Sequence, residues 1–323
     1  MKAIVCPSYG PPDVLELREI GKPAVHDNEV LVRIHASSVN IAQWHAMTGL
    51  YIGRPPLGWR KPKDTRLGVD FSGVVEAVGK NVTRFRPGDE VFGGRHGAFA
   101  EYICVREDRA VALKPANLTF EQAAAVPTAG TTALQALRDH GQIQPGQQVL
   151  INGASGGVGT FAVRIAKAFG AEVTAVCSPQ NLDMARALGA EPVIDYTRED
   201  FTRSERRYDL MLDIAGGRSW SECKRILKSN ATLVLVGAAT SNRWIGPLGH
   251  VLRIRLASLR ASQKVVFFIA EFKQEDFAVL RELIESGKVT PFIERGYPLS
   301  QTADAMRYLG TGHARGKLVI TVR

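Results

Sequence analysis

The chain has 323 residues, 45% of them hydrophobic, which supplies enough apolar surface for one large domain or two medium ones. No run of about 18 apolar residues is present, so no membrane-spanning helix is expected. The net charge of +9 indicates attraction to anions. We interpret it first as a solvated basic surface, ahead of a nucleic-acid, membrane or phosphate-bearing partner, and we expect no nucleic-acid partner.

The N-terminal segment predicts a short strand and a turn, and it lacks the apolar core and cleavage site of a secretory signal. Four cysteines are widely spread along the chain, without a CxxC pair. That spacing favours reduced thiols in a cytoplasmic setting and argues against a structural zinc lobe.

The first third of the chain predicts β-structure, with strands near residues 29–34, 72–78 and 101–105 separated by glycine-rich turns. Such short strands indicate a small antiparallel barrel or sandwich. Thr119 is then expected to cap a helix that begins at Phe120, with Gln122 as the partner in a capping box.

From Gln148 onward, apolar strands alternate with amphipathic helices, a pattern typical of a parallel sheet with right-handed crossovers. The last fifty residues predict helices at 275–287 and 301–309 and a closing strand at 316–322. We therefore predict an α/β protein of two domains, the second inserted into the first. The expected boundaries give one domain of residues 1–122 and 274–323 and an inserted domain of residues 123–273.

The most informative motif follows the strand that ends near residue 152. The turn after it carries small residues and opens a helix that ends near Phe169, and its residues are Ala154, Ser155, Gly156, Gly157, Val158 and Gly159. Residues without bulk let backbone N–H groups approach a pyrophosphate, and the N-terminus of a helix favours its negative charge. The motif predicts dinucleotide binding; a glycine turn without a ligand is the weaker alternative.

The end of the next strand distinguishes the two nicotinamide cofactors. NAD enzymes usually place an acid there, whereas this chain reads Cys177-Ser178-Pro179-Gln180-Asn181. Without a carboxylate to repel a 2′-phosphate, and with Ser178 and Asn181 as hydrogen-bond donors, the sequence favours NADPH. Arg186 is either a further phosphate ligand or a solvated helix arginine.

Several segments together resemble the medium-chain dehydrogenase/reductase superfamily, in its zinc-free quinone oxidoreductase branch, over nearly the whole chain. They include Gly68-Val69-Asp70-Phe71-Ser72-Gly73, Gly88-Asp89-Glu90-Val91, Ala125-Val126-Pro127-Thr128-Ala129-Gly130, the glycine turn, Leu188-Gly189-Ala190 and Gly316-Lys317. The resemblance implies a GroES-like β-barrel catalytic domain split around a doubly wound Rossmann domain, with the active site in the cleft between them. It also implies a homodimer joined through Rossmann sheet edges.

The sequence differs from the zinc-dependent members of the superfamily at the positions of their catalytic zinc ligands. Where they carry a GHE motif this chain has Gly68-Val69-Asp70, and in the region of their early cysteine it reads Val39-Asn40-Ile41, without a thiol. A catalytic zinc needs about three N or S ligands in the protein, so we expect no metal. Without a Lewis acid a saturated alcohol is a poor substrate, whereas a quinone or an α,β-unsaturated carbonyl needs only hydrogen bonds to the oxygen that gains charge.

The resemblance also implies roles for single residues. Asn40 is expected near the nicotinamide, and Gln43 replaces a family aspartate, so any role of that carboxylate is lost. The remaining implied cofactor contacts are Thr128, Tyr196, Gly237, Phe267, Phe268 and Lys317.

Three further side chains have weaker assignments. His45 and His96 are candidate proton donors, although structural histidines are more common. Tyr51 is a candidate catalytic residue that would cover the substrate, or else a solvent-facing aromatic. It lies in the loop 51–65, which we interpret as a mobile lid that sets specificity.

Between Lys224 and Ala270 the chain contains no acid, and residues 248–259 show leucines at helical spacing with arginines on other faces. Three hypotheses compete for residues 243–264: a cap over the active site that includes Trp244 and Leu248, a subunit contact, and an amphipathic helix that meets an anionic membrane, in that order. The function predicted is NADPH-dependent reduction of quinones or enones. The alternatives are a zinc-free alcohol or aldehyde oxidoreductase and a non-enzymatic NADPH-binding protein with nucleic-acid or membrane contacts.

Overall fold

The computed structural model describes residues 1–49, 57–237 and 248–322, so the candidate Tyr51 and Trp244 lie outside the described residues. The chain divides into two compact units. The first comprises Met1–Thr131, Phe272–Glu285 and Pro291–Arg323, and the second comprises Thr132–Glu271 and Ser286–Thr290. No helix in the described ranges has the length and apolar content needed to cross a membrane.

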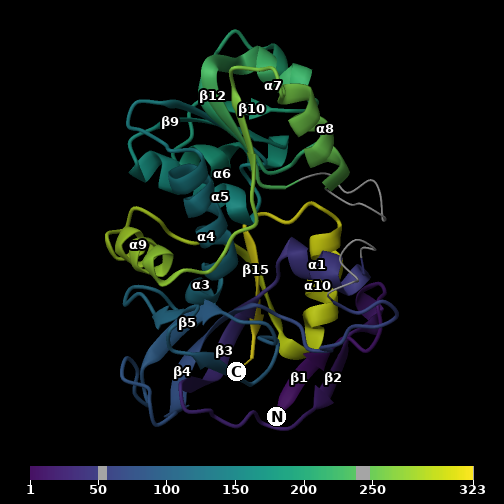
Figure 1. The fold of residues 1–323 in the computed structure, drawn as a ribbon, viewed down its shortest axis with the longest axis vertical. Coiled ribbons are helices and arrows are strands. Elements are labelled where there is room, and N and C mark those ends of the chain that lie inside the picture. The colour runs from purple at the N-terminus through teal and green to yellow at the C-terminus, as the bar shows by residue number, and fades with distance from the viewer. Residues whose placement is uncertain (50–56, 238–247, 323) are drawn as a thin grey trace. The chain divides into compact units, whose positions relative to one another are not determined.

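The first unit is built on a β-sheet of seven strands whose main path runs β14-β15-β3-β4-β5-β7, with β6 paired to β3 (Figure 1). The strands of the whole unit are β1 (Lys2–Val5), β2 (Glu16–Glu19), β3 (Glu29–Ser38), β4 (Asp70–Val78), β5 (Glu90–Gly94), β6 (Tyr102–Arg106), β7 (Val111–Leu113), β14 (Ile293–Pro298) and β15 (Lys317–Thr321). Strands β1 and β2 form a separate hairpin. All neighbours pair antiparallel except β14 and β15, which confirms the expected small antiparallel architecture.

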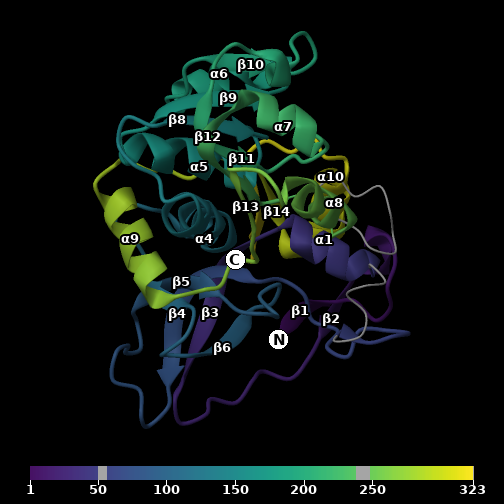
Figure 2. The same ribbon diagram turned by 45° about the horizontal axis from the view of Figure 1, so that its top comes forward.

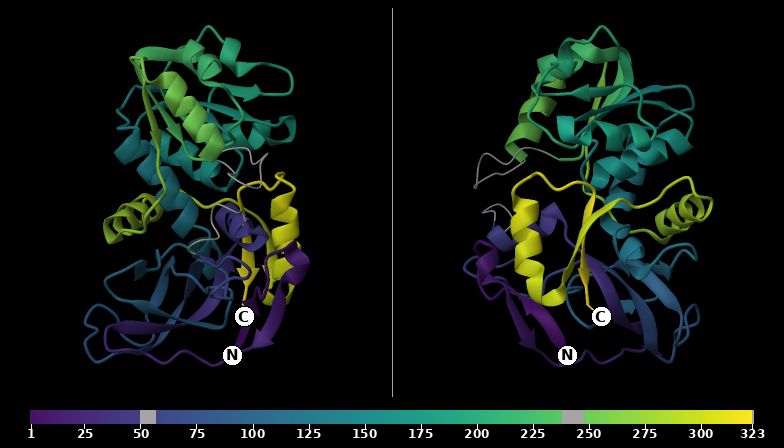
Figure 3. Two further views of the ribbon diagram at one scale, coloured as in Figure 1. Left: turned by 45° about the vertical axis from the view of Figure 1, so that its right-hand side comes forward. Right: turned by 180° about the vertical axis from the view of Figure 1, so that it is seen from behind.

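Local sequence explains where the helices of this unit begin and end. Its helices are α1 (Ile41–Thr48), α3 (Phe120–Ala124), α9 (Gln274–Glu285) and α10 (Thr302–Gly310), and α4 (Pro127–Gln135) begins in it. Thr119 caps α3 and Gln122 closes the capping box, as predicted. Helix α1 ends at Thr48 and is capped by Gly49, whose φ of 68° suits glycine. Figure 3 shows α1 and α10 side by side.

The second unit is a parallel sheet of six strands in the order β10-β9-β8-β11-β12-β13 (Figure 2). The strands are β8 (Gln148–Asn152), β9 (Glu172–Cys177), β10 (Val193–Asp195), β11 (Tyr208–Asp213), β12 (Leu227–Leu235) and β13 (Lys264–Phe267). The helices after α4 are α5 (Gly157–Ala168), α6 (Leu182–Ala187), α7 (Trp220–Ile226) and α8 (Leu248–Ser258). This strand order is that of a doubly wound sheet and confirms the predicted Rossmann topology.

The core of the second unit explains which faces the helices bury. Apolar residues of α7 and α8, among them Trp220, Val251 and Ile254, pack in one buried cluster with side chains of the central strands, such as Met211 and Leu233. In Figure 1, α7 and α8 lie along one side of the sheet, and α5 and α6 lie on the other. Strand order reverses between β8 and β11, and in such sheets ligands bind outside the carboxyl ends of the strands at this position.

Candidate functional site

The glycine turn lies where β8 ends and α5 begins, in the second unit. β8 ends at Asn152, Gly153 adopts a φ of 87°, and Gly156 is the N-cap of α5 in an extended conformation. Ala154 is fully buried, whereas Ser155 to Val158 are partly exposed. The turn thus presents the backbone of residues 155–158 at the N-terminus of a twelve-residue helix, where N–H groups and the helix dipole favour an anion.

The space around each glycine separates packing from ligand binding. A Cβ added at Gly159 would lie 2.2 Å from the carbonyl oxygen of Gly153 and 2.7 Å from the Cα of Ala154, so close helix–strand packing explains this glycine. A Cβ added at Gly156 would meet only the carbonyl oxygen of Gly153, at 3.7 Å. The protein itself therefore has room for a side chain at Gly156, and its absence fits a pyrophosphate that approaches the backbone.

The ends of β9 and β10 carry the candidate residues for the adenosine side. Asn181 is buried, and its Nδ2 donates to Oγ of Ser178 over 2.8 Å. Tyr196 directly follows β10 and is half-exposed, and its backbone N–H donates to the carbonyl oxygen of Cys177. Ser178, Asn181 and Tyr196 are thus brought to adjacent strand ends by the pairing of β9 and β10. Arg186, in contrast, pairs with Asp183 at 2.8 Å.

Strands β12 and β13 carry the remaining candidates of this unit. Gly237 stands two residues after β12, and a Cβ there would lie 2.2 Å from the carbonyl oxygen of Ile214, so backbone packing already requires a glycine. Phe267 ends β13 and packs on the core cluster. The ring of Phe268 lies 4.2 Å from that of His140. Roles of these three residues toward a cofactor stay predictions.

A buried polar cluster in the first unit is centred on Asp70. Asp70 is fully buried at the start of β4, and its Oδ2 accepts from Ser38 Oγ at 2.7 Å and from Asn40 Nδ2 at 2.9 Å. Its Oδ1 accepts from the backbone N–H of Thr128 at 3.0 Å and from Oγ1 of the same residue. Thr128 lies in the first turn of α4, where a carboxylate is favourable.

Lys317 completes the cluster from the start of β15. Its side chain is 3% exposed, and its ammonium lies 2.5 Å from Asn40 Oδ1 and 3.4 Å from Asp70 Oδ2. Burial lowers the pKa of Lys317, and the carboxylate of Asp70 opposes that shift. The resemblance implied that Lys317 contacts the cofactor; the structure engages its ammonium with Asn40 and Asp70.

These contacts orient the amide of Asn40 without ambiguity. An ammonium can only donate, so Lys317 must face the amide oxygen, and a carboxylate can only accept, so Asp70 must face the amide nitrogen. One Nδ2 hydrogen then remains for another acceptor. Asn40 itself is partly exposed. The arrangement therefore presents a fixed hydrogen-bond donor backed by a buried cation.

The central role of Asp70 in this cluster was not predictable from the sequence, in which Asp70 stood out only as the third residue of the lost GHE motif. Gln43, predicted to have lost an acid's role, has a structural one: its Oε1 accepts from the backbone N–H of Asn40 at 2.9 Å. This bond fixes the first turn of α1 and thereby the position of Asn40.

A second buried carboxylate that sequence analysis missed lies at the end of β11. Asp213 is fully buried, and its Oδ1 accepts from Asn152 Nδ2 at 2.7 Å and from the backbone N–H of Gly216 at 2.9 Å. Burial raises the pKa of Asp213, and these hydrogen bonds oppose the shift. Because Asn152 directly precedes Gly153, the contact fixes the position from which the glycine turn begins.

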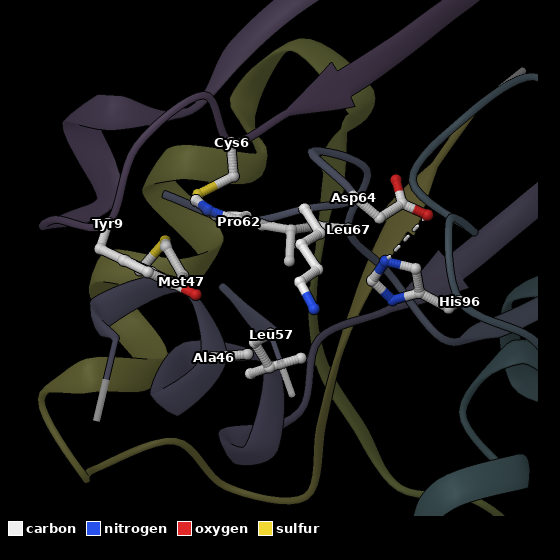
Figure 4. Close-up of a pocket in the computed structure, with 10 residues that line it drawn as sticks. Cys6, Tyr9, Ala46, Met47, Leu57, Pro62, Asp64, Leu67 and His96 are labelled. Carbon is white, nitrogen blue, oxygen red and sulfur yellow. Dashed lines mark ion pairs between the residues drawn. The ribbon is translucent and has the colours of Figure 1, made fainter. Parts of the chain in front are cut away.

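A cavity of about 220 Å³ opens in the first unit beside the second half of α1 (Figure 4). Cys6, Tyr9, Met47 and Leu67 line it together with Leu57, Lys63 and Asp64 from the described part of the loop 51–65, and with His96. His96 Nε2 lies 3.6 Å from Asp64 Oδ2, as the dashed line in Figure 4 marks. Burial lowers the pKa of His96, and the carboxylate of Asp64 opposes that shift.

The cavity and Asn40 stand at opposite ends of α1. Asn40 precedes its first residue and Met47 is its seventh, a separation of roughly 10 Å at the 1.5 Å rise of a helix. Burial also lowers the pKa of His45, whose ring packs edge-on against Trp44 at 5.3 Å. His96 thus faces a carboxylate, whereas the buried Nδ1 of His45 has no hydrogen-bond partner among the described residues. A role of either histidine as proton donor stays a prediction.

Within residues 1–49, 57–237 and 248–322, no three His, Cys, Asp or Glu side chains cluster in a way that could hold a metal ion. All four cysteines are free thiols. At the positions of the zinc ligands of related dehydrogenases, Asn40 belongs to the hydrogen-bonded cluster described above, and Val69 has no ligating atom.

Comparisons with protein families match both parts of the chain. Residues 26–116 match the family described as "Alcohol dehydrogenase GroES-like domain", and residues 188–320 match "Zinc-binding dehydrogenase". The segment matched to the second family contains neither Asn40 nor Val69.

Individual relatives match over the full length. The chain is 35% identical to the mouse protein "NAD(P)H oxidoreductase RTN4IP1, mitochondrial", over 100% of this chain and 89% of that protein. It is 32% identical to "NADPH-dependent alkenal/one oxidoreductase, chloroplastic" of Arabidopsis thaliana, over 99% of this chain and 79% of the relative. Among solved structures, the quinone oxidoreductase from Coxiella burnetii superposes with a TM-score of 0.89 at 33% identity, over 100% of this chain and 99% of that one.

Proposed function

Because the chain belongs to the zinc-free quinone oxidoreductase branch of the medium-chain dehydrogenase/reductase superfamily, we propose that it reduces quinones or α,β-unsaturated carbonyl compounds with NADPH. Relatives named for NADPH and for alkenal/one or quinone reduction support the proposal. The observation that carries it is the open space at Gly156, which a bound pyrophosphate explains and protein packing does not. NADPH, when bound, supplies the hydride. The protein's own residues bind the cofactor, orient the acceptor and polarise its carbonyl group.

On the cofactor side, the proposal assigns the pyrophosphate to the backbone of residues 154–159 and the 2′-phosphate to Ser178, Asn181 and Tyr196. The hydrogen bond from Asn181 to Ser178 holds one polar side chain against the other at the end of β9, beside the end of β10. No acid occurs from Cys177 to Asn181 to repel a phosphate. Gly237, Phe267 and Phe268 are retained as proposed contacts on the nicotinamide side.

On the acceptor side, the proposal assigns to Asn40 the hydrogen bond that stabilises the carbonyl oxygen as it gains negative charge. Its second Nδ2 hydrogen is the donor, because the first is held by Asp70. The Lys317 ammonium on the amide oxygen polarises the amide and strengthens that donor. A preorganised donor of this kind does for a conjugated carbonyl what a metal does for an alcohol, at smaller magnitude. Thr128 and Lys317 then act through Asp70 and Asn40 as positioning residues.

We also propose domain boundaries, an oligomeric state and a cellular location. The catalytic domain would comprise residues 1–122 and 274–323 and the cofactor domain residues 123–273. A homodimer is supported by the position of β13 at an edge of the six-stranded sheet. A cytoplasmic location is supported only by the free thiols, and relatives are named as mitochondrial or chloroplastic.

The test is NADPH oxidation, followed at the nicotinamide absorbance band, with a 1,2-quinone, a 1,4-quinone, an enone and a saturated aldehyde, each with and without chelator and with NADH as control. We expect turnover of quinone or enone that prefers NADPH and is unaffected by chelator. Aldehyde turnover that vanishes with chelator would instead indicate a metal-dependent alcohol or aldehyde reductase. Tight NADPH binding without turnover of any acceptor would indicate a binding protein.

A variant separates the role of Asn40 from general damage. Asn40→Ala is expected to lower kcat about 100-fold, the usual loss when one oxyanion donor is removed, with the Kd for NADPH changed less than about threefold. Thr48→Ala, in the last turn of the same helix, removes a partly buried hydroxyl that donates to the carbonyl oxygen of Trp44, and it serves as a control with near-normal kcat. Equal kcat values for Asn40→Ala and the control would exclude the proposed donor.

A further inference from the structure

Helix α8 carries a row of exposed leucines, defined here as the leucine stripe: Leu248, Leu252, Leu256 and Leu259. Their exposures are 38%, 59%, 58% and 77%. Spacings of four, four and three residues place them on one face of the helix and its immediate continuation. Single exposed leucines are normal on protein surfaces, but four on one helical face form a continuous apolar strip.

The opposite arc of α8 already anchors the helix to its own unit. Val251 and Ile254 are 6% and 2% exposed and belong to the core cluster with α7 and the sheet. In both views of Figure 3, α8 lies along the outside of that sheet. Because the core contact uses Val251 and Ile254, it leaves the leucine stripe directed away from the sheet.

Arginines border the leucine stripe on both sides. At 100° per residue, Arg255 lies 20° before Leu248, and Arg260 and Arg253 lie about 40° and 60° beyond Leu256. All three are exposed, and in the part of the chain that the structure describes none of them forms an ion pair. No acid occurs between Lys224 and Ala270 to neutralise them. The surface is thus apolar in the middle and cationic at its borders.

We infer that this surface docks onto an anionic lipid bilayer, with the leucines inserted at the level of the headgroups and the arginines against lipid phosphates. Such a division of apolar and cationic faces is what an interfacial helix needs. With eleven residues, α8 is too short to span a bilayer, so the contact is peripheral. The inference does not rest on the proposed reductase function.

Two other occupants fit the same surface less well. A second copy of the chain that paired stripe to stripe would bring arginine borders against each other, with no acid between Lys224 and Ala270 to pair with them. Single-stranded nucleic acid is bound by stacking on aromatic side chains, and residues 248–260 contain no Phe, Tyr or Trp. An acidic protein partner is an outcome that the experiment distinguishes.

The experiment is flotation of the full-length protein with lipid vesicles of phosphatidylcholine alone or with 30% phosphatidylglycerol, at low and high salt. We expect binding to the anionic vesicles that weakens with salt, and at least tenfold less binding to the neutral ones. No binding of the wild-type protein to anionic vesicles would overturn the inference.

Paired variants assign the binding to this surface. Leu252→Ser with Leu256→Ser is expected to reduce partitioning about tenfold or more, and Arg253→Gln with Arg260→Gln about fivefold for each arginine removed. Leu17→Ser and Arg206→Gln remove an exposed leucine and an exposed arginine elsewhere and should leave partitioning unchanged. An unchanged thermal midpoint in all variants shows that folding is intact.

Three further outcomes would contradict the inference. Unchanged partitioning of the leucine variant would mean that the net charge alone binds lipid. A shift of that variant from dimer to monomer in sedimentation, with lipid binding retained, would identify the stripe as a contact between copies. Failure of both leucine and arginine variants to alter lipid binding, with loss of binding to an acidic protein, would identify a protein-docking surface.

Discussion

Replacing Gly156 by alanine should separate cofactor binding from stability. The added Cβ would meet no protein atom closer than 3.7 Å, and the φ of −79° is open to alanine. Loss of backbone freedom in the unfolded chain stabilises by about 0.4–1 kcal/mol, while alanine is a poorer N-cap than glycine by a similar amount. We therefore expect the free energy of unfolding of the cofactor-free protein to change by less than about 0.5 kcal/mol.

Binding of NADPH should respond differently, because the methyl group would occupy the space that we assign to the pyrophosphate. Overpacking of this kind costs about 1–3 kcal/mol, which is a loss of roughly 5- to 150-fold in affinity. Gly159→Ala is the matched control: its Cβ would overlap backbone atoms of Gly153 and Ala154, so it should destabilise the cofactor-free protein itself, by about 3 kcal/mol.

The assay combines titration of NADPH by fluorescence with urea unfolding of the free protein. An affinity of Gly156→Ala equal to that of the wild type would refute the assignment of the pyrophosphate to this turn. Destabilisation of Gly156→Ala as large as that of Gly159→Ala would show that the space at Gly156 is not open, and that its glycine has a packing role after all.

Three further predictions test the surroundings of the site. Lys317→Met should lower the free energy of unfolding by about 3 kcal/mol, because it leaves the fully buried carboxylate of Asp70 without its cation. The double variant with Asp70→Asn should lose less stability than the sum of the two single variants. Additive losses in urea unfolding would exclude coupling between Lys317 and Asp70. Burial raises the pKa values of the four cysteine thiols to about 11 or 12. They should therefore react with Ellman's reagent at pH 8 far more slowly in the native protein than after unfolding. Fast reaction of all four thiols in the native protein would contradict this burial. Hydrogen bonds from Arg66 lower the pKa of Asp64 to about 2, so the contribution of Asp64 to stability is present above about pH 4 and is lost as the pH falls through 2. Asp64→Asn should therefore be less stable than the wild type at pH 6 and approach the wild-type stability toward pH 2.5, whereas Asp183→Asn, the control, should show no such pH dependence. A stability difference for Asp64→Asn that does not change with pH would count against the ion pair.

Features set by neighbouring residues were predictable from the sequence. The capping box of Thr119 and Gln122 spans four residues, and the glycine turn lies between one strand and one helix, so local chemistry was sufficient for both. Alternation of strand and helix likewise predicted the parallel sheet, because each crossover is a local unit.

Features that depend on long-range register were not predictable. Ser38 pairs with both Asp70 and Val319, so the pairing of β3 with β4 and β15 brings Asp70 and Lys317 to Asn40 across 30 and 277 residues. Only the family resemblance pointed to Asn40 and Lys317 together, and it did not indicate that they contact each other. The leucines of residues 248–259 predicted a helix, but not that the core would bury Val251 and Ile254 and leave the others exposed.

The central claim is that the protein moves a hydride from NADPH to a conjugated carbonyl without a metal. Its most direct test uses NADPH that carries deuterium at both C4 positions of the dihydronicotinamide, an enone acceptor, and protein treated with chelator, with the product analysed by mass spectrometry and NMR. The account predicts one deuterium per product molecule, bonded to the former β-carbon. Product without deuterium, or deuterium transfer that stops on chelation and returns with zinc, would contradict it.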